Sequence, residues 1–428
     1  METLQEPAPP TGREEARAAG APASRAPASA PPGEHVGLPA RAKTAPAAPP
    51  QALAGSSTAD PRPTLARARA ADHGDLLCGL GFLAALYAFL LSVDLMSTAF
   101  GLLGGGFASQ LLHQASNPVA GLMIGLLTTS LVQSSSLTTS LAVGLVAMDI
   151  LPLRLAVPIV MGANIGTTVT STIISLGHIS RRAEFSRAFS AGVIHDCYNI
   201  LTAAVLFPIE CLFHPIESIC VWMAGEFAGA GGLRLISPLR ELTAPISKAL
   251  VRLVPHAVPL LLLALLALFL ALTGMVKIMR RLVMTRIERF FGRVLFRNDL
   301  AGFSFGWILT ALVQSSSVTT SLAVPLVGTG VLSLRKIYPY ALGANIGTTV
   351  TCVLAAFALG KPAGIMVAGA HLTFNLMGTL IFYPARALPL GLASWLGRTA
   401  GRSQRHTALI LALYLLFFSL PVIYILAH

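Results

Sequence analysis

Residues 131–143 read LVQSSSLTTSLAV and residues 312–324 read LVQSSSVTTSLAV, so twelve of the thirteen positions are identical at an offset of 181. The same offset relates two identical copies of GANIGTTVT, at 162–170 and 343–351. Two motifs repeated in the same order and at one offset indicate an internal duplication. The chain is therefore predicted to consist of two related halves.

A third pair of matching residues follows in each half. His195 and Asn199 correspond to His371 and Asn375 at an offset of 176. Packing alone would conserve size and apolarity, yet the copied residues include Gln, Ser, Thr, Asn and His. Such groups are costly in hydrocarbon unless they have partners or line a watery cavity. The duplication therefore favours a shared function over packing alone.

The composition is that of a membrane protein. The chain has 428 residues, of which 54% are hydrophobic and only 11% charged, with a mean hydropathy of +0.72. Crossing a bilayer takes about 20 apolar residues. We therefore expect an all-α, multi-pass protein of the plasma (inner) membrane. The clearest apolar runs of sufficient length are 76–100, 188–208, 256–276 and 408–427.

The repeats suggest how the chain is divided. Residues 1–75 are rich in Ala, Pro, Arg and Gly and nearly lack large apolar side chains, which predicts a disordered tail. Repeat 1 is expected at 76–208, an external inter-repeat loop at 209–255, repeat 2 at 256–385, and a connection with the last transmembrane helix at 386–428.

The charges predict that the two repeats have inverted topology. The connection after the first GANIGTTVT carries Arg181, Arg182 and Arg187, whereas its counterpart at 359–362 carries one lysine. Basic connections stay on the cytoplasmic side, so these two connections are expected on opposite sides. The net charge of +12 has the same interpretation: the basic residues lie in connections between spans and do not indicate a nucleic-acid interface.

Each QSSS copy lies in a run rich in Gly, Ser and Thr, which suits a re-entrant hairpin that breaks at depth in the membrane. A broken helix offers free N–H groups to an anion, while carbonyl, hydroxyl and amide oxygens suit sodium. Asn and Thr of each GANIGTT are expected to add ligands. The candidate binding residues are Gln133, Ser134, Ser135, Ser136, Asn164, Thr167, Thr168, Gln314, Ser315, Ser316, Ser317, Asn345, Thr348, Thr349 and Thr351.

His195 and Asp196 lie together inside an apolar run, and the second half keeps His371 but has Leu372 in place of the acid. His195, Asp196 and Asn199 are therefore a possible extra cation site or shared scaffold. The sequence does not separate these two roles.

At these residues the chain resembles the type II sodium-dependent phosphate cotransporters. The resemblance rests on the paired QSSS motifs, on VIHDCYN at 193–199 and on PLVGTGVLSLRKIYPYALGANIGTT at 325–349. It implies a phosphate and sodium site formed by Gln133 to Ser136, Gln314 to Ser317, Thr348 and Thr351. The short inter-repeat stretch and the lack of any Asn-x-Ser/Thr sequence imply a bacterial-type member.

Other functions remain open from the sequence alone. Another small anion is the alternative substrate. The stretch Gly302-Phe303-Ser304-Phe305-Gly306 matches the nucleophile-elbow pattern of serine hydrolases, but no strand–turn–helix context surrounds it. We expect a transporter and not an enzyme, with no cofactor and with sodium as the only metal. The oligomeric state is not predicted.

Overall fold

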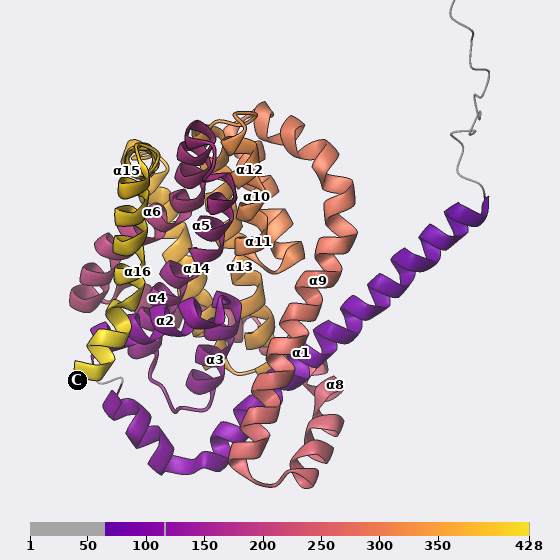
Figure 1. Cartoon of the computed structure of the whole chain (residues 1–428). Coiled ribbons are helices and arrows are strands. Elements are labelled where there is room, and N and C mark those ends of the chain that lie inside the picture. The colour runs from indigo at the N-terminus through magenta and orange to yellow at the C-terminus, as the bar shows by residue number, and fades with distance from the viewer. Residues whose placement is uncertain (1–64, 115–116, 428) are drawn as a thin grey trace, which may run out of the picture. The chain divides into compact units, whose positions relative to one another are not determined.

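The computed structural model describes residues 65–114 and 117–427, and within them every regular element is a helix. Side chains are described except at 65–75, 104–114, 233–240, 283–296 and 426. Most of the predicted disordered tail, residues 1–64, lies outside the described residues. The helices shown in Figure 1 are α1 (Leu65–Gln114), α2 (Pro118–Val132), α3 (Ser135–Ala147), α4 (Leu153–Gly166), α5 (Val169–Ser175), the 3₁₀ turn η1 (Leu176–His178), α6 (Arg182–Phe213), α7 (Pro215–Gly229), α8 (Gly232–Leu253), α9 (Ala257–Arg297), α10 (Asp299–Val313), α11 (Ser316–Ser321), α12 (Ala323–Gly328), α13 (Leu334–Leu359), α14 (Pro362–Phe382), α15 (Ala387–Ala400) and α16 (Gln404–Ala427).

Within the described residues, seven helical stretches are long and apolar enough to cross a bilayer. This confirms the prediction of an all-α membrane protein with several spans. The four apolar runs singled out in the sequence fall largely within four of these stretches. The seven stretches are Leu76–Leu103, Leu153–His178, Arg182–Phe213, Ala257–Leu282, Leu334–Leu359, Pro362–Phe382 and Gln404–Ile425.

Each QSSS copy lies at a break between short apolar helices. The first break separates α2 from α3, and the second separates α10 from α11. α2 and α10 also begin in the same way, because Asn117 Oδ1 accepts the Ala120 N–H at 2.8 Å and Asn298 Oδ1 accepts the Ala301 N–H at 2.7 Å. Such caps satisfy a helix's first free N–H groups. The duplication thus extends from motif to local geometry.

In the first half, α2 packs closely against α4 because glycines lie at their contact. A Cβ on Gly125 would collide with the Ile159 carbonyl oxygen. A Cβ on Gly162 would collide with the Leu122 carbonyl oxygen. Small residues of this kind let helix backbones approach within a membrane. The two glycines therefore fix how the hairpin helix sits on its neighbour.

The second half repeats this contact between α10 and α13, which lie side by side in Figure 1. Gly306 faces the Tyr340 carbonyl oxygen, and Gly343 faces the Phe303 carbonyl oxygen. Each of these four residues is displaced by 181 positions from its partner in the first half. Duplicated sequence has therefore produced a duplicated helix pair.

The identical GANIGTTVT copies differ in one respect. In the first half α4 ends at Gly166 and α5 begins at Val169, so Thr167 and Thr168 interrupt the helix. In the second half the same nine residues lie inside the uninterrupted helix α13. The interrupted copy places Thr167 in the wall of the candidate site, where its backbone oxygen accepts a hydrogen bond from Ser317.

The stretch between the repeats, expected as a loop at 209–255, contains α7 and α8. The C-terminal stretch expected at 386–428 contains α15 and α16.

Buried apolar side chains of α1, α3, α9 and α13 pack together, including Phe89, Met96, Val143 and Leu268. This cluster lies beside the break between α2 and α3.

Candidate functional site

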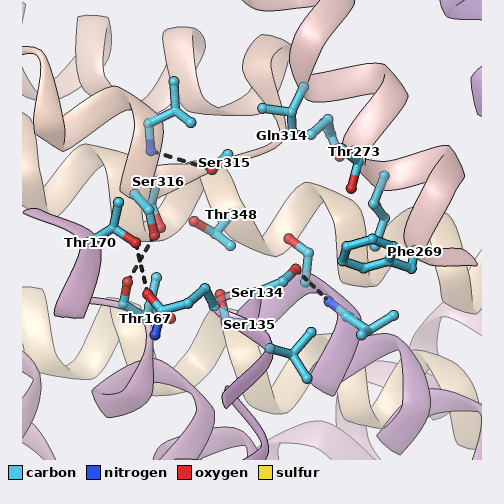
Figure 2. A pocket seen from close by; sticks show the side chains of 18 of the residues that line it. Ser134, Ser135, Thr167, Thr170, Phe269, Thr273, Gln314, Ser315, Ser316 and Thr348 are labelled. Atoms are coloured by element: carbon cyan, nitrogen blue, oxygen red, sulfur yellow. Dashed lines mark hydrogen bonds between the residues drawn. The ribbon is translucent and has the colours of Figure 1, made fainter. Parts of the chain in front are cut away.

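Both QSSS copies line one cavity of about 310 Å³. Figure 2 shows residues of the two copies facing the same space. The wall consists of the two helix breaks, the GANIGTT helices and one face of α9. Its residues are Val132, Gln133, Ser134, Ser135, Ser136, Leu137, Thr167, Thr170, Phe269, Leu272, Thr273, Val276, Lys277, Gln314, Ser315, Ser316, Ser317, Val318 and Thr348.

Gln133 and Gln314 end the first helix of each pair in the left-handed conformation, with φ of 56° and 60°. The backbone N–H of Gln133 donates to Thr129 O, and that of Gln314 donates to Thr310 O, both at 2.7 Å. A non-glycine residue adopts this conformation at a cost, and such positions cluster at ligand-binding sites. The same unfavourable backbone in both halves therefore points to function at the two breaks.

The amide side chains of these glutamines hold each break to a GANIGTTVT helix of the same half. Gln133 Oε1 accepts the Thr170 hydroxyl at 2.9 Å, and Gln314 Oε1 accepts the Thr351 hydroxyl at 2.7 Å. The two threonines are equivalent under the offset of 181. Thr170 also lines the cavity, whereas Thr351 lies behind Gln314 and is not part of the lining.

The first serine of each motif caps the next helical segment. Ser134 Oγ accepts the Leu137 N–H at 3.2 Å, and Ser315 Oγ accepts the Val318 N–H at 3.4 Å. The second serines, Ser135 and Ser316, are buried at the cavity wall. The serine run thus provides a cap first and a wall hydroxyl next.

The third serine of each motif contacts the opposite half. Ser136 Oγ donates to Thr351 Oγ1 at 3.3 Å, whereas Ser317 Oγ donates to the backbone oxygen of Thr167 at 2.8 Å. Thr167 lies at the interruption between α4 and α5, where a helix carbonyl lacks its usual partner. The two halves are therefore joined across the cavity by serine hydroxyls, with different acceptors.

The α9 face supplies residues that sequence reasoning missed: Phe269, Thr273 and Lys277. Lys277 follows directly after the apolar run 256–276 and was interpreted only as the start of a basic connection. Thr170 was also missed, although it lies three residues after Thr167, a spacing that places two side chains on one face of a continuous helix. A first charged residue at the end of a span, and an i, i+3 hydroxyl pair, were the available signals.

Several predicted binding residues lie outside the cavity lining. The Thr168 and Thr349 hydroxyls donate to backbone oxygens of Ile165 and Ile346 one turn earlier. Such bonds are the usual arrangement for threonine within a helix. Their role as ligands stays a prediction.

Asn164 and Asn345 belong to a buried cluster between the two halves. The ring Nε2 of His195 contacts Asn345 Oδ1, and that of His371 contacts Asn164 Oδ1 at 3.3 Å. Asn345 Nδ2 donates to Asn199 Oδ1 at 2.9 Å. Each half's histidine thus pairs with the other half's asparagine. This geometry suits the scaffold interpretation of the histidines better than a place in the cavity.

Asp196 points away from that cluster. Its Oδ2 accepts the Thr172 hydroxyl at 3.3 Å and the Tyr414 hydroxyl at 3.2 Å. Tyr414 lies on α16, outside both repeats. Asp196 is therefore held by one residue from its own repeat and one from the C-terminal helix.

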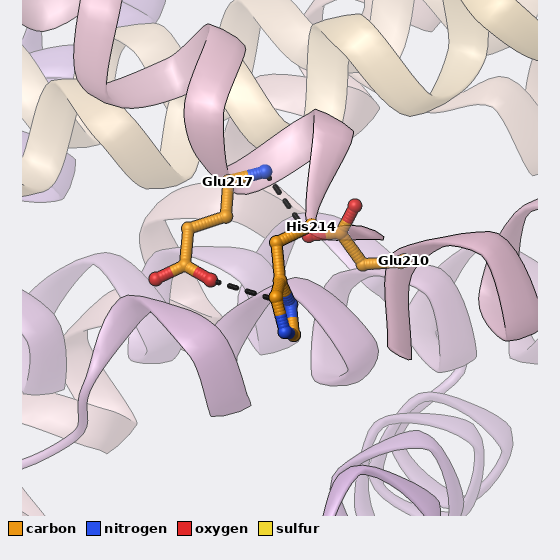
Figure 3. A group of neighbouring side chains, drawn as sticks. All are labelled: Glu210, His214 and Glu217. Atoms are coloured by element: carbon orange, nitrogen blue, oxygen red, sulfur yellow. Dashed lines mark hydrogen bonds and ion pairs between the residues drawn. The ribbon is translucent and has the colours of Figure 1, made fainter. Parts of the chain in front are cut away.

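A second cluster of titratable groups joins α6 to α7 and is shown in Figure 3. Glu210 accepts the backbone N–H groups of Ile216 at 2.7 Å and Glu217 at 3.0 Å. His214 Nδ1 lies 3.6 Å from a Glu217 carboxylate oxygen. Because both oxygens of Glu210 satisfy the free N–H groups at the start of α7, the cluster is explained as a helix cap.

The main cavity can bind a small oxyanion together with a hard cation. Serine and threonine hydroxyls donate to anion oxygens, and the N-terminus of α3 and the charge of Lys277 favour negative charge. The same hydroxyls, with amide and carbonyl oxygens, accept a cation that prefers oxygen ligands. The cavity contains no carboxylate among its described lining residues, so an anion meets no fixed negative charge there.

The chain matches the family described as Na+/Pi-cotransporter over residues 88–206 and 267–423, which include both QSSS copies. It is 31% identical over 451 residues to sodium-dependent phosphate transport protein 2B of Pongo abelii and of Homo sapiens, covering 82% of this chain. The chain spans 64% of the length of each of these relatives.

A further relative is sodium-dependent phosphate transport protein 2A of Rattus norvegicus. It is 32% identical over 443 residues, which is 85% of this chain and 70% of that protein. No solved structure matches the chain. The similarity therefore extends over most of the described helices and rests on sequence alone.

Proposed function

The chain belongs to the Na+/Pi-cotransporter family, and we propose that it carries inorganic phosphate across the plasma membrane together with sodium. The observation that supports this most directly is the convergence of both QSSS breaks on one cavity. Family membership alone would not single out a site, whereas two breaks from different halves around one cavity support a substrate site between them. Because the members of this family are transporters, membership also removes the serine-hydrolase alternative.

In this proposal phosphate binds between Ser135 and Ser316. Their hydroxyls donate to its oxygens, and the free N–H groups at the start of α3 stabilise its charge. Lys277 adds a positive charge at the wall. Sodium is held by oxygens of the same breaks, including those of Gln133 and Gln314, in the manner of secondary transporters with discontinuous helices.

We further propose that the two halves have inverted topology with re-entrant hairpins, as in a bacterial-type member of the family. Support comes from the duplicated helix pairs and from the unequal charge of the equivalent connections, with Arg181 and Arg182 in one and Lys361 in the other. Inverted halves that rock around a central site would expose it alternately to each side of the membrane.

Uptake of radiolabelled phosphate into proteoliposomes tests the transport proposal. An imposed sodium gradient should drive accumulation, and replacing external sodium by choline or potassium should abolish it. Equal uptake in all three salts would remove the sodium coupling. No phosphate uptake, but sodium-driven uptake of another small anion, would reassign the substrate.

Single cysteines introduced at Ser180 and at Lys361 test the inverted arrangement, in a background whose five native cysteines are replaced. A membrane-impermeant thiol reagent applied to intact cells should label one position only, and both should be labelled after permeabilisation. Labelling of both positions from the outside would contradict inversion and favour a parallel duplication.

A further inference from the structure

The helical arm that follows each QSSS break ends in the same way in both halves. α3 ends at Ala147, and α12 ends at Gly328, which is displaced from Ala147 by 181 positions. Two residues further on, Asp149 and Gly330 both have a left-handed backbone, with φ of 58° and 84°. The duplication therefore includes the turn at the end of each arm.

These turns satisfy most of the carbonyl groups at the two helix ends. A helix leaves its last four carbonyl groups without partners inside the helix. In the first half, N–H groups of residues 148–151 donate to the backbone oxygens of residues 144–146. In the second half, N–H groups of residues 329, 330 and 332 donate to the backbone oxygens of residues 325–327. The oxygens of Ala147 and Gly328 are therefore the ones that still require a donor.

A basic side chain from the opposite half donates to each of these two oxygens. Lys361 Nζ, in the connection between α13 and α14, donates to Ala147 O at 2.7 Å. Arg187 Nε, in the second turn of α6, donates to Gly328 O at 2.9 Å. A positive charge is favourable at the C-terminus of a helix. Among the described residues no carboxylate forms an ion pair with either side chain, so each cation is matched to a helix end.

The two basic residues were not inherited together through the duplication. Under the offset of 176 that relates His195 to His371, Lys361 corresponds to Phe185 and Arg187 corresponds to Ala363. Two positions that are not equivalent, with different side chains, therefore supply a cation to two oxygens that are equivalent. A requirement that applies to both arms explains this agreement better than inheritance does.

The two bonds lie on opposite sides of the membrane in the proposed inverted topology. Arg187 belongs to the basic end of α6, expected on the cytoplasmic side, whereas Lys361 lies in the connection expected on the outer side. Each arm starts at a serine of the cavity wall, Ser135 or Ser316. α3 has 13 residues, which is about 20 Å of helix. Each bond therefore connects one side of the membrane to one serine of the candidate site.

We propose that Lys361 and Arg187 are positioning residues for transport, and that their bonds form two latches between the halves. The outer latch, Lys361 to Ala147, holds the α3 arm to the second half. The inner latch, Arg187 to Gly328, holds the α12 arm to the first half. The cavity opens to one side when the latch of that side breaks while the other stays closed. The assignment of a side to each latch rests on the proposed function and topology.

Labelling of a cysteine in the cavity wall measures the side to which the cavity opens. Thr273 faces the cavity from α9 in Figure 2, so Thr273→Cys is the reporter, in a background whose five native cysteines are replaced. A membrane-impermeant thiol reagent is applied to intact cells and to inside-out vesicles, without phosphate. Lys361→Met should raise the labelling rate from the outside about tenfold and lower it from the inside, and Arg187→Met should do the reverse.

Conservative variants and exposed basic residues provide the controls. Lys361→Arg and Arg187→Lys keep the cation and should return both rates toward those of the intact latches. Lys248→Met in α8 and Arg335→Met at the start of α13 remove exposed charges and should leave both rates unchanged. If Lys361→Met and Arg187→Met shift labelling in the same direction, or if either folded variant leaves both rates unchanged, the pair of latches is refuted.

Glutamine variants carry the test if a methionine variant fails to fold. Lys361→Gln and Arg187→Gln keep a neutral donor, so each should shift labelling in the direction given for its methionine variant, by a smaller factor. Unchanged rates in either would refute that latch. The labelling needs no uptake, so a chain that carries no phosphate would overturn the transport proposal and still decide the latches.

Uptake kinetics separate a latch from a bond that only supports the fold. Loss of the inner latch favours the inward-open state, which lowers the fraction of protein ready to bind external phosphate. Arg187→Met should therefore raise the KM for external phosphate, by up to about tenfold, whereas Lys361→Met should not raise it. A purely structural role would lower the maximal rate of both variants through the amount of folded protein and leave both KM values unchanged, and that result would overturn the proposal.

Discussion

The two GANIGTTVT copies have the same nine residues but not the same structure. The first is divided between α4 and α5, and the second lies within α13. Intrinsic helix propensity is identical inside the motif, so its neighbours must cause the difference. Ser-Thr-Ile-Ile-Ser follows the first copy and Cys-Val-Leu-Ala-Ala follows the second, and serine and threonine compete with the helix for backbone hydrogen bonds.

Tertiary contacts act in the same direction. Ser317 of the second half donates to the Thr167 backbone oxygen, and Thr172 donates to Asp196. At the second copy, Ser136 of the first half instead contacts the Thr351 side chain, so the α13 backbone is left intact. An identical motif thus acquires two geometries because each copy is bonded by the other half's hairpin in a different way.

The largest expected effect concerns what the two halves share. Ser135→Trp and Ser316→Trp should each abolish phosphate uptake, because an indole would fill the cavity that both serines line. The matched controls are Leu131→Trp on α2 and Leu312→Trp on α10, the helices just before each break. Both leucines are exposed, so these variants should retain uptake. Normal uptake by either serine variant, with normal expression, would remove that half from the substrate site.

A smaller effect, on stability and equal in the two halves, is expected at the glycine contacts between helices. Gly162→Ala and Gly343→Ala should each lower the free energy of unfolding by roughly 1–3 kcal/mol, because the added methyl collides with a backbone carbonyl. That cost exceeds the gain in helix propensity of about 1 kcal/mol. Melting temperatures in detergent would show two similar decreases.

Gly79→Ala provides the control for this pair, since a Cβ there meets no atom within 4 Å. It should leave the melting temperature unchanged or raise it slightly. A decrease for Gly162→Ala without one for Gly343→Ala would show that the two helix contacts are not equivalent.

The sequence predicted the features that depend on periodicity and local motifs. Long apolar runs predicted the spans, and the QSSS copies predicted two breaks, because both signals are contained in a few neighbouring residues. The place of Asn164 and Asn345 was harder to predict. A polar side chain in a span serves equally well as a ligand or as a partner for another helix, and only the position of His195 and His371 in space separates these roles.

The smallest effect would refine the comparison at the two glutamines. Thr351 is fully buried and bonds both Gln314 and Ser136, whereas Thr170 bonds Gln133, whose side chain is exposed. Valine has the shape of threonine without the hydroxyl. In Thr351→Val the oxygen of Gln314, whose side chain is buried, loses its donor, which costs about 1–3 kcal/mol. Exposed Gln133 recovers a hydrogen bond from water in Thr170→Val.

We therefore expect Thr351→Val to raise the KM for phosphate about tenfold and Thr170→Val to raise it less than about threefold, since 1.4 kcal/mol corresponds to a factor of ten. Initial rates of uptake at varied phosphate would give both values. Thr351→Ser keeps the hydroxyl and should restore most of the affinity. Equal increases for the two valine variants would mean that both breaks are equally shielded from water, and the difference in burial between the halves would then have no consequence for binding.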